Sequence, residues 1–383
     1  MAEEQVKAAE NKERPAVMPI VASPESEKHR PVGLIVAVVA LACVVIGLSW
    51  LGYSRMSIPV AVPQSNAPAA AQPMIIGLSI ADFRESRWLT ERDIMTAEAA
   101  KLGATVISMT ADGDAALQTA QAKNLMLQGA QVLIVVSQDG EKAAAIVDEA
   151  HQGGVKVIAY DRLIKNSDLD YYVTFDSVKV GMDEAQGVLD ATGGKGRFVY
   201  IGGSPTDNNA ALVRNGSFKV LQPKIDSGAV QIVLDQQIPD WNATTAYQVM
   251  KGFLDKGGKL DAAVVANDGM AGGVIQALKE HGLAGKVPVS GQDAELRACR
   301  DLLTGNQTIT VYKPLKQLAT EAIRMAVAAA GGQPVQTDLT TDNGKVKVPS
   351  RLLDVVAVTK QNLDSTVIKD GLYTQADVYG AKP

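Results

Sequence analysis

The sequence predicts an α/β protein with two doubly wound parallel sheets, preceded by one transmembrane helix. Three observations lead to this prediction. Short apolar runs alternate with amphipathic stretches from Met74 onward, a pattern typical of parallel strands joined by helices. The same alternation starts again at Arg197. A stretch of 23 residues without any charge, 32–54, precedes both blocks.

The N-terminal residues are expected to tether the protein to a membrane. Residues 1–31 are charged and lack apolar periodicity, which predicts a disordered cytoplasmic tail. The run 32–54 is long enough to cross a hydrocarbon core of about 30 Å as a helix. Basic residues are denser before this run than after it, which puts the later part of the chain on the periplasmic side. Residues 55–73 are rich in proline and alanine and predict a semi-extended linker.

Three interpretations of the run 32–54 remain open. A retained signal anchor in the cytoplasmic membrane is favoured, because some 30 residues precede the run and it has full spanning length. A cleaved signal peptide would use the A-x-A sequences at 67–69 or 69–71, which lie well downstream. A lipoprotein would be modified at Cys43, where VALAC loosely resembles a lipobox.

Each block contains five apolar runs that are expected to form strands. Strands that are apolar at nearly every position belong to parallel sheets covered by helices on both faces. Stretches 91–102 and 115–128 are two such helices. The expected strands are 74–80, 104–109, 130–136, 155–160 and 171–175 in the first block, and 197–203, 230–235, 262–268, 287–293 and 308–314 in the second.

Polar side chains follow most of these strands. In an open parallel sheet, ligands bind beyond the carboxyl ends of the strands. Carboxylates accept hydrogen bonds from hydroxyls, arginine and lysine donate them, and tryptophan covers the apolar face of a sugar ring. A single aspartate or asparagine after a strand is usually a helix cap, but so many together favour a site for a neutral polyhydroxylated ligand. The residues are Asp82, Arg84, Arg87, Trp88, Asp161, Arg162, Asp207, Asn208, Asn209, Trp241, Asn267, Gln292, Asp293 and Lys313.

Composition and motifs argue against several other classes of protein. A net charge of −5 argues against nucleic-acid binding. The 3 histidines are isolated from one another, so no metal site is expected. Cys43 and Cys299 are interpreted as free thiols. The chain has no G-x-S-x-G, P-loop or G-x-G-x-x-G sequence, so neither an enzyme nor a bound cofactor is predicted.

Seven motifs in the exported part resemble one known family. They are RESRW, YDR, GGSPTDNNA, the AND of VVANDGMAGG, SGQDAEL, VYKP and VPSRLL. Their order and spacing resemble those of the D-xylose-binding branch of the ribose/galactose/xylose-type (type I) periplasmic sugar-binding proteins of ABC transporters. The resemblance extends from about Met74 to Tyr373.

The resemblance implies a fold and a set of sugar ligands. The fold has two α/β lobes joined by a three-strand hinge, with the sugar bound in the cleft between them and the lobes closing on it. The implied lobes are 74–178 plus 314–345, and 179–313 plus 346–383. The implied sugar-binding residues are Arg87, Trp88, Asp161, Arg162, Asn208, Trp241, Asn267, Asp293 and Lys313.

Two functions compete under this resemblance. The first is a membrane-tethered receptor that delivers a monosaccharide, D-xylose before others, to an ABC permease. The second is a sensor subunit that binds the same sugar and signals to a histidine kinase or a chemoreceptor. A transcriptional repressor of similar fold would need an N-terminal helix-turn-helix, and the uncharged run 32–54 occupies that place. The sequence does not separate import from sensing.

Overall fold

The computed structural model describes residues 73–380 of the chain. The predicted tail, the predicted membrane span and all but the last residue of the predicted linker lie outside this range. Within residues 73–380, no helix is both long enough and apolar enough to cross a membrane.

Strands and helices alternate along the first part of the described chain. In chain order they are β1 (Met74–Ile80), α2 (Arg87–Lys101), β2 (Ala104–Thr110), α3 (Ala115–Leu127), β3 (Val132–Val135), α4 (Ala144–Gln152), β4 (Lys156–Tyr160), β5 (Tyr171–Phe175), α5 (Ser177–Ala191), β6 (Gly196–Gly202), α6 (Asn208–Asp226), β7 (Val230–Gln237) and the short 3-10 helix η1 (Pro239–Trp241).

The second part continues to the end of the described range. Its elements are α7 (Ala243–Asp255), β8 (Ala262–Val265), α8 (Asp268–Glu280), α9 (Leu296–Thr304), β9 (Thr310–Tyr312), α10 (Leu315–Ala330), β10 (Leu339–Asp342), β11 (Lys347–Leu353), β12 (Val356–Val358), the π-helical turn η2 (Asp364–Ile368) and α11 (Gln375–Tyr379).

The first sheet has seven strands in the order β10-β11-β5-β4-β3-β1-β2. All neighbours pair in parallel except β10 and β11. Successive residues of β3 pack on opposite faces: Ile134 contacts the core under α2 and α10, whereas Leu133 contacts the core under α3 and α4. Because both faces are covered, the central strands β1, β3 and β4 are mostly apolar and buried. The predicted parallel strands of this block are confirmed, and β2, at the edge of the sheet, is only partly buried.

The second sheet is smaller than predicted. It has three parallel strands in the order β7-β6-β8, with α5 and α6 on one face and α7 and α8 on the other. The stretch 287–293 makes only isolated bridges at Val289 and Gln292, so the predicted strand there is wrong. Its backbone pairing with β8 is limited to Ala263, whose N–H donates to Pro288 O at 2.9 Å and whose oxygen accepts from the Ser290 N–H at 3.2 Å. Pro288 has no N–H to extend the ladder, and the Ser290 hydroxyl bonds both backbone groups of Val265. The expected strand 308–314 shortens to β9, which pairs with β12 in a separate antiparallel sheet.

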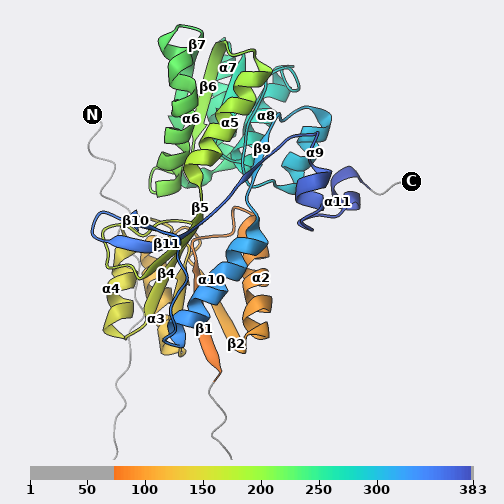
Figure 1. The fold of residues 1–383 in the computed structure, drawn as a ribbon. Coiled ribbons are helices and arrows are strands. Elements are labelled where there is room, and N and C mark those ends of the chain that lie inside the picture. Colours follow the sequence, from red (N-terminus) through yellow and green to blue (C-terminus); the bar gives the residue numbers. More distant parts are fainter. Residues whose placement is uncertain (1–72, 381–383) are drawn as a thin grey trace, which may run out of the picture. The chain divides into compact units, whose positions relative to one another are not determined.

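The chain passes between the two sheets three times. The passages follow β5, β9 and β11. The predicted boundary between residues 345 and 346 comes too early, because β11 pairs with β5, with Ser350 opposite Tyr172. The chain therefore leaves the first sheet after Leu353. Figure 1 shows the late elements α10, β10 and β11 lying with the early strands, and α10 beside α2.

Candidate functional site

Polar side chains that follow strands of both sheets enclose a small cavity. Seven of the nine predicted site residues line it, and Trp88 and Asn208 do not. The lining residues are Glu85, Arg87, Asp161, Arg162, Asp207, Asn209, Trp241, Asn267, Gln292, Asp293 and Lys313.

Arg87 is the central cation of the cavity. It opens α2, directly after the loop that follows β1. Its guanidinium donates to Asp161 at 2.9 Å, to Glu91 at 2.8 Å and to Asp293 at 3.3 Å. Its side chain is only 3% exposed, so these three carboxylates compensate a buried positive charge. Arg87 thus links Asp161, which follows a strand of the first sheet, to Asp293, which lies on the side of the second sheet.

Asp161 stands at the carboxyl end of β4 in a left-handed conformation, with φ of 61°. Its carboxylate accepts from Arg87 and from the Asn209 amide, the latter at 2.9 Å. Burial alone would raise the pKa of Asp161, but Arg87 and Lys313 hold it below the ordinary value. Asp161 therefore remains an ionised acceptor on the cavity wall.

Arg162 follows Asp161 and connects two further carboxylates. Its Nε lies 3.1 Å from Asp207, and its terminal nitrogen donates to Glu85. Two opposite charges after one strand therefore have different partners: Asp161 is held by Arg87, and Arg162 is held by Glu85 and Asp207. Each charge is compensated by residues elsewhere in the cavity wall.

Helix capping and cavity lining coincide at two positions. Asn267 caps α8, because its Oδ1 accepts from the Met270 N–H at 2.9 Å. Asp207 caps α6 by accepting from the Asn209 N–H at 2.8 Å. Both residues also line the cavity. The two interpretations of an aspartate or asparagine after a strand are therefore compatible, since a cap uses one oxygen and the other polar atom of the side chain can face the cavity.

The predicted residue Asn208 is replaced in the cavity by its neighbour Asn209. Asn208 is the first residue of α6 and is only half-buried. Successive helical residues point about 100° apart, so only one of the two can face the cavity. Asn209 is 5% exposed and donates to Asp161.

The two predicted tryptophans differ in their positions. Trp241 lines the cavity, donates from Nε1 to Asp207 at 3.1 Å, and covers Gly203 so closely that a Cβ there would lie 2.1 Å from its ring. Trp88 is buried behind the cavity wall, with its ring 4.3 Å from the Arg87 guanidinium carbon. Its prediction as a lining residue is not supported by this geometry; it packs beneath Arg87 instead.

Four lining residues are not among the sugar ligands that the resemblance implies, although three of them were named among the polar residues that follow strands. Asp207, Asn209 and Gln292 lie inside the motifs quoted above, one position from a predicted residue. Glu85 lies in RESRW, and its carboxylate accepts from Arg162 and from Trp88 Nε1. Burial raises the pKa of Glu85 to about 7, although Arg162 lowers it. The sequence signal for Glu85 as a site residue was its position in the loop that follows β1.

The cavity is suited to binding rather than to catalysis. Its wall holds four carboxyl groups and three cationic groups, and no serine, cysteine or histidine. Within residues 73–380, no cluster of three or more histidine, cysteine, aspartate or glutamate side chains is arranged to hold a metal ion. The donors and acceptors point at one another across the cavity, where a hydroxylated molecule could exchange hydrogen bonds with them.

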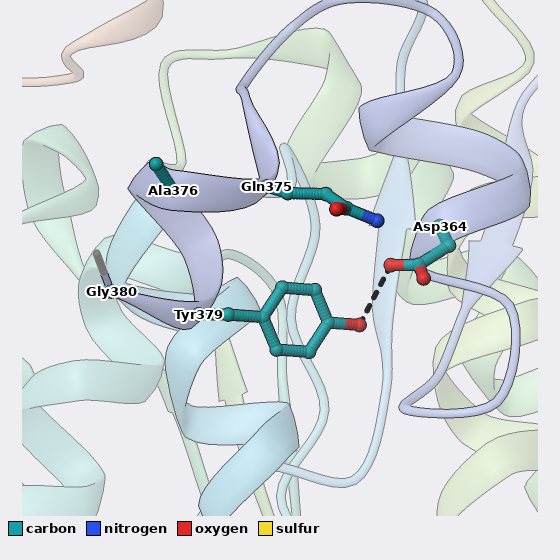
Figure 2. Close-up of a pocket in the computed structure, with 5 residues that line it drawn as sticks. All are labelled: Asp364, Gln375, Ala376, Tyr379 and Gly380. Carbon is teal, nitrogen blue, oxygen red and sulfur yellow. Dashed lines mark hydrogen bonds between the residues drawn. The ribbon is translucent and has the colours of Figure 1, made fainter. Parts of the chain in front are cut away.

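A second hollow lies near the end of the described chain, between η2 and α11. Figure 2 shows Tyr379 and Asp364 at its edge, joined by a hydrogen bond of 2.7 Å. The hollow contains about 940 Å³ of empty space but is open to solvent and holds no predicted site residue. Since its two strongest polar groups bond each other, we do not assign it a role.

The chain matches known proteins along most of its length. Residues 76–334 match the model of a periplasmic binding protein domain. The chain belongs to the periplasmic binding protein family. The D-xylose-binding periplasmic protein of Haemophilus influenzae is 43% identical over 82% of this chain and 95% of its own length, and that of Escherichia coli is 42% identical with the same coverage.

A solved structure agrees with the sequence matches. A carbohydrate transporter solute-binding protein from Chloroflexus aurantiacus, in complex with D-glucose, is 32% identical. It covers 80% of this chain and 98% of its own, with a TM-score of 0.75. The predicted resemblance and the predicted α/β fold of this family are therefore confirmed. The family consists of binding proteins rather than enzymes, as predicted.

Proposed function

We propose that this protein captures a monosaccharide, D-xylose before others, and presents it to an ABC sugar importer. The cavity between the two sheets carries this proposal, because charged and amide groups from both sides converge on it. Relatives named as D-xylose-binding proteins match 95% of their own lengths. The proposal extends their printed function to this chain.

The proposed sugar contacts follow from the cavity wall. Asp161 and Asp293 accept hydrogen bonds from sugar hydroxyls, and Arg87, Arg162 and Lys313 donate to them. Asn267 donates from its amide nitrogen, Asn209 exchanges a hydrogen bond to Asp161 for one to the sugar, and Asn209 takes the role first expected of Asn208. Trp241 covers the apolar face of the ring, whereas Trp88 supports Arg87. Hydrogen bonds with one charged partner are about twice as strong as neutral ones, which offsets the loss of water from the sugar.

We further propose that the two sheets are the centres of two lobes that close on the sugar. The first lobe would be 74–175 with 315–353, and the second 177–312 with 356–380. The three passages after β5, β9 and β11 would form the hinge. A sugar that contacts residues of both lobes binds the closed form more tightly than the open form, so its binding favours closure.

The run 32–54 is proposed to anchor the protein in the cytoplasmic membrane, with residues 55–73 as a tether and the binding part on the periplasmic side. An anchored receptor would hold sugar beside its permease. The same anchor supports the second candidate, a sensor subunit that reports lobe closure to a membrane kinase or chemoreceptor. Co-purification of the full chain with either a permease or a kinase would separate the two candidates.

Calorimetric titration of the full chain in detergent tests the proposed function. The sugars are D-xylose, D-ribose, L-arabinose, D-galactose and D-glucose. We expect micromolar or tighter binding of D-xylose and weaker binding of the others. Tighter binding of another sugar would correct the proposed ligand, and no heat with any of the five would contradict a monosaccharide receptor.

A further inference from the structure

One carboxylate of the second lobe is held by two side chains of the first lobe, outside the sugar cavity. Asp240 follows β7, within η1. One of its oxygens lies 3.3 Å from a terminal nitrogen of Arg84, which follows β1. The other accepts from the Gln138 amide, which follows β3, at 3.0 Å. Each oxygen therefore has its own partner across the cleft.

Arg84 is oriented before it meets Asp240. The Asp82 carboxylate accepts from the Arg84 backbone N–H at 2.8 Å and from its Nε at 2.9 Å. Asp82 is itself only 7% exposed. Because the guanidinium is fixed at one edge, less side-chain freedom is lost when its other edge contacts Asp240.

These contacts differ from the other side-chain contacts between the lobes, although the Gly140 N–H also donates to Thr206 O across the lobes at 3.1 Å, outside the cavity. Arg87 with Asp293, Arg162 with Asp207, and Asn209 with Asp161 all join residues that line the cavity. A sugar that hydrogen-bonds to those side chains competes with their mutual contacts. Arg84, Gln138 and Asp240 do not line the cavity, so their contacts remain when it is occupied.

Asp240 is also joined to the cavity wall through the backbone. Asp240 and Trp241 both have left-handed conformations, with φ of 56° and 55°. Such conformations are uncommon for residues other than glycine and persist where surrounding contacts enforce them. The contacts of Asp240 with Arg84 and Gln138 therefore also keep the neighbouring Trp241 in its position against the cavity.

We propose that Asp240 is a latch, a positioning residue that with Arg84 and Gln138 sets how long the closed form retains its sugar without touching it. This inference rests on the proposed monosaccharide binding. The latch acts on release rather than on encounter, because its contacts form only when the lobes have closed.

Asp240→Asn in the full chain tests the latch. Asparagine has the same size and tolerates the left-handed conformation, so the change removes the charge and leaves the backbone. We expect D-xylose to dissociate about 2- to 5-fold faster in stopped-flow tryptophan fluorescence, the effect of a half-exposed ion pair. The association rate and the melting temperature should stay unchanged. Raising the salt concentration should reduce the difference, because salt screens exposed charges.

Asp235→Asn is the matched control. Asp235 is 38% exposed, compared with 42% for Asp240, and pairs with Arg214 inside the second lobe at 2.6 Å. Its loss should leave dissociation unchanged. Gln138→Glu puts a second carboxylate beside Asp240, and we expect a larger acceleration than in Asp240→Asn. If the native protein binds a sugar and both latch variants release it at the native rate, the latch is wrong and the proposed function stands. If the native protein binds none of the five sugars, both are wrong.

Discussion

Two buried carboxyl groups, Asp161 in the cavity and Glu184 in α5, show how surroundings decide the charge of an acid. Their exposed fractions are 3% and 0%. Asp161 accepts from Arg87 and Asn209. Neither oxygen of Glu184 has a hydrogen-bond partner within residues 73–380. Burial lifts the pKa of Glu184 well above its ordinary value, whereas cations keep that of Asp161 low.

The difference separates a binding role from a packing role. An ionised acceptor with cations around it can exchange one hydrogen bond for another when a ligand arrives. A neutral carboxylic acid without hydrogen-bond partners fills space in the core. Its unpaired oxygens reduce the free energy of unfolding. Equal burial therefore does not mean an equal role, and substitutions at the two positions should affect different properties.

The largest effect is expected at Asp161. Asp161→Ala removes an acceptor for the sugar and leaves the Arg87 charge less compensated, so D-xylose binding should weaken by about 2–4 kcal/mol. Calorimetric titration measures the loss. Asp93→Ala on the exposed side of α2 is the control, since its side chain is 68% exposed. Unchanged affinity in Asp161→Ala would mean that Asp161 does not bind the sugar. It would then not differ from Glu184 in its role.

Glu184→Gln should affect stability and its dependence on pH. The raised pKa means that the folded protein keeps a proton which the unfolded chain releases above its ordinary pKa of about 4.5. Native stability is therefore lost as pH rises from that value toward the raised pKa. Glutamine carries no such proton, so we expect the variant to gain about 1–3 kcal/mol at pH 8, or about 2–8 °C in melting temperature. The gain should shrink toward pH 5.

Thermal melts between pH 5 and pH 8 measure this effect. Glu149→Gln is the control, because the Glu149 side chain is 39% exposed on α4. Equal slopes of melting temperature against pH in the native protein and Glu184→Gln would mean that Glu184 is not protonated in the fold. D-xylose binding should stay within twofold of the native value, since Glu184 does not line the cavity.

The sequence predicts buried strands well where every residue is apolar. All four residues of β3 are buried, and no other structure fits such a run between two helices. The stretch 287–293 looks similar but holds Pro288 and Ser290, and its backbone pairing with β8 is limited to two hydrogen bonds with Ala263. Strand β11 was missed because its place between β10 and β5 depends on pairing with β5, which is distant in the chain.

The sequence predicts the chemistry of the cavity better than it predicts the individual residues that line it. Strand ends identify which loops reach the site, but the side chain that faces inward depends on where each helix begins. Glu85 shows the limit of sequence patterns, since its partner Arg162 is 77 residues away. Its place after β1 indicates a loop that reaches the site, but the local sequence does not show that the Glu85 side chain is enclosed by Arg162 and Trp88.

The smallest effect concerns two neighbouring asparagines and sharpens the comparison from the side of Asp161, because only one of them is a partner of that carboxylate. Asn209→Ala removes a buried donor to Asp161, so D-xylose binding should weaken by about 1–2 kcal/mol. Asn208→Ala changes a half-buried side chain outside the cavity, and its effect should stay below about 0.5 kcal/mol. Titrations of the two variants under one condition measure the difference. A larger loss in Asn208→Ala would mean that α6 begins one residue later when sugar is bound, which would restore the position that the motif first predicted.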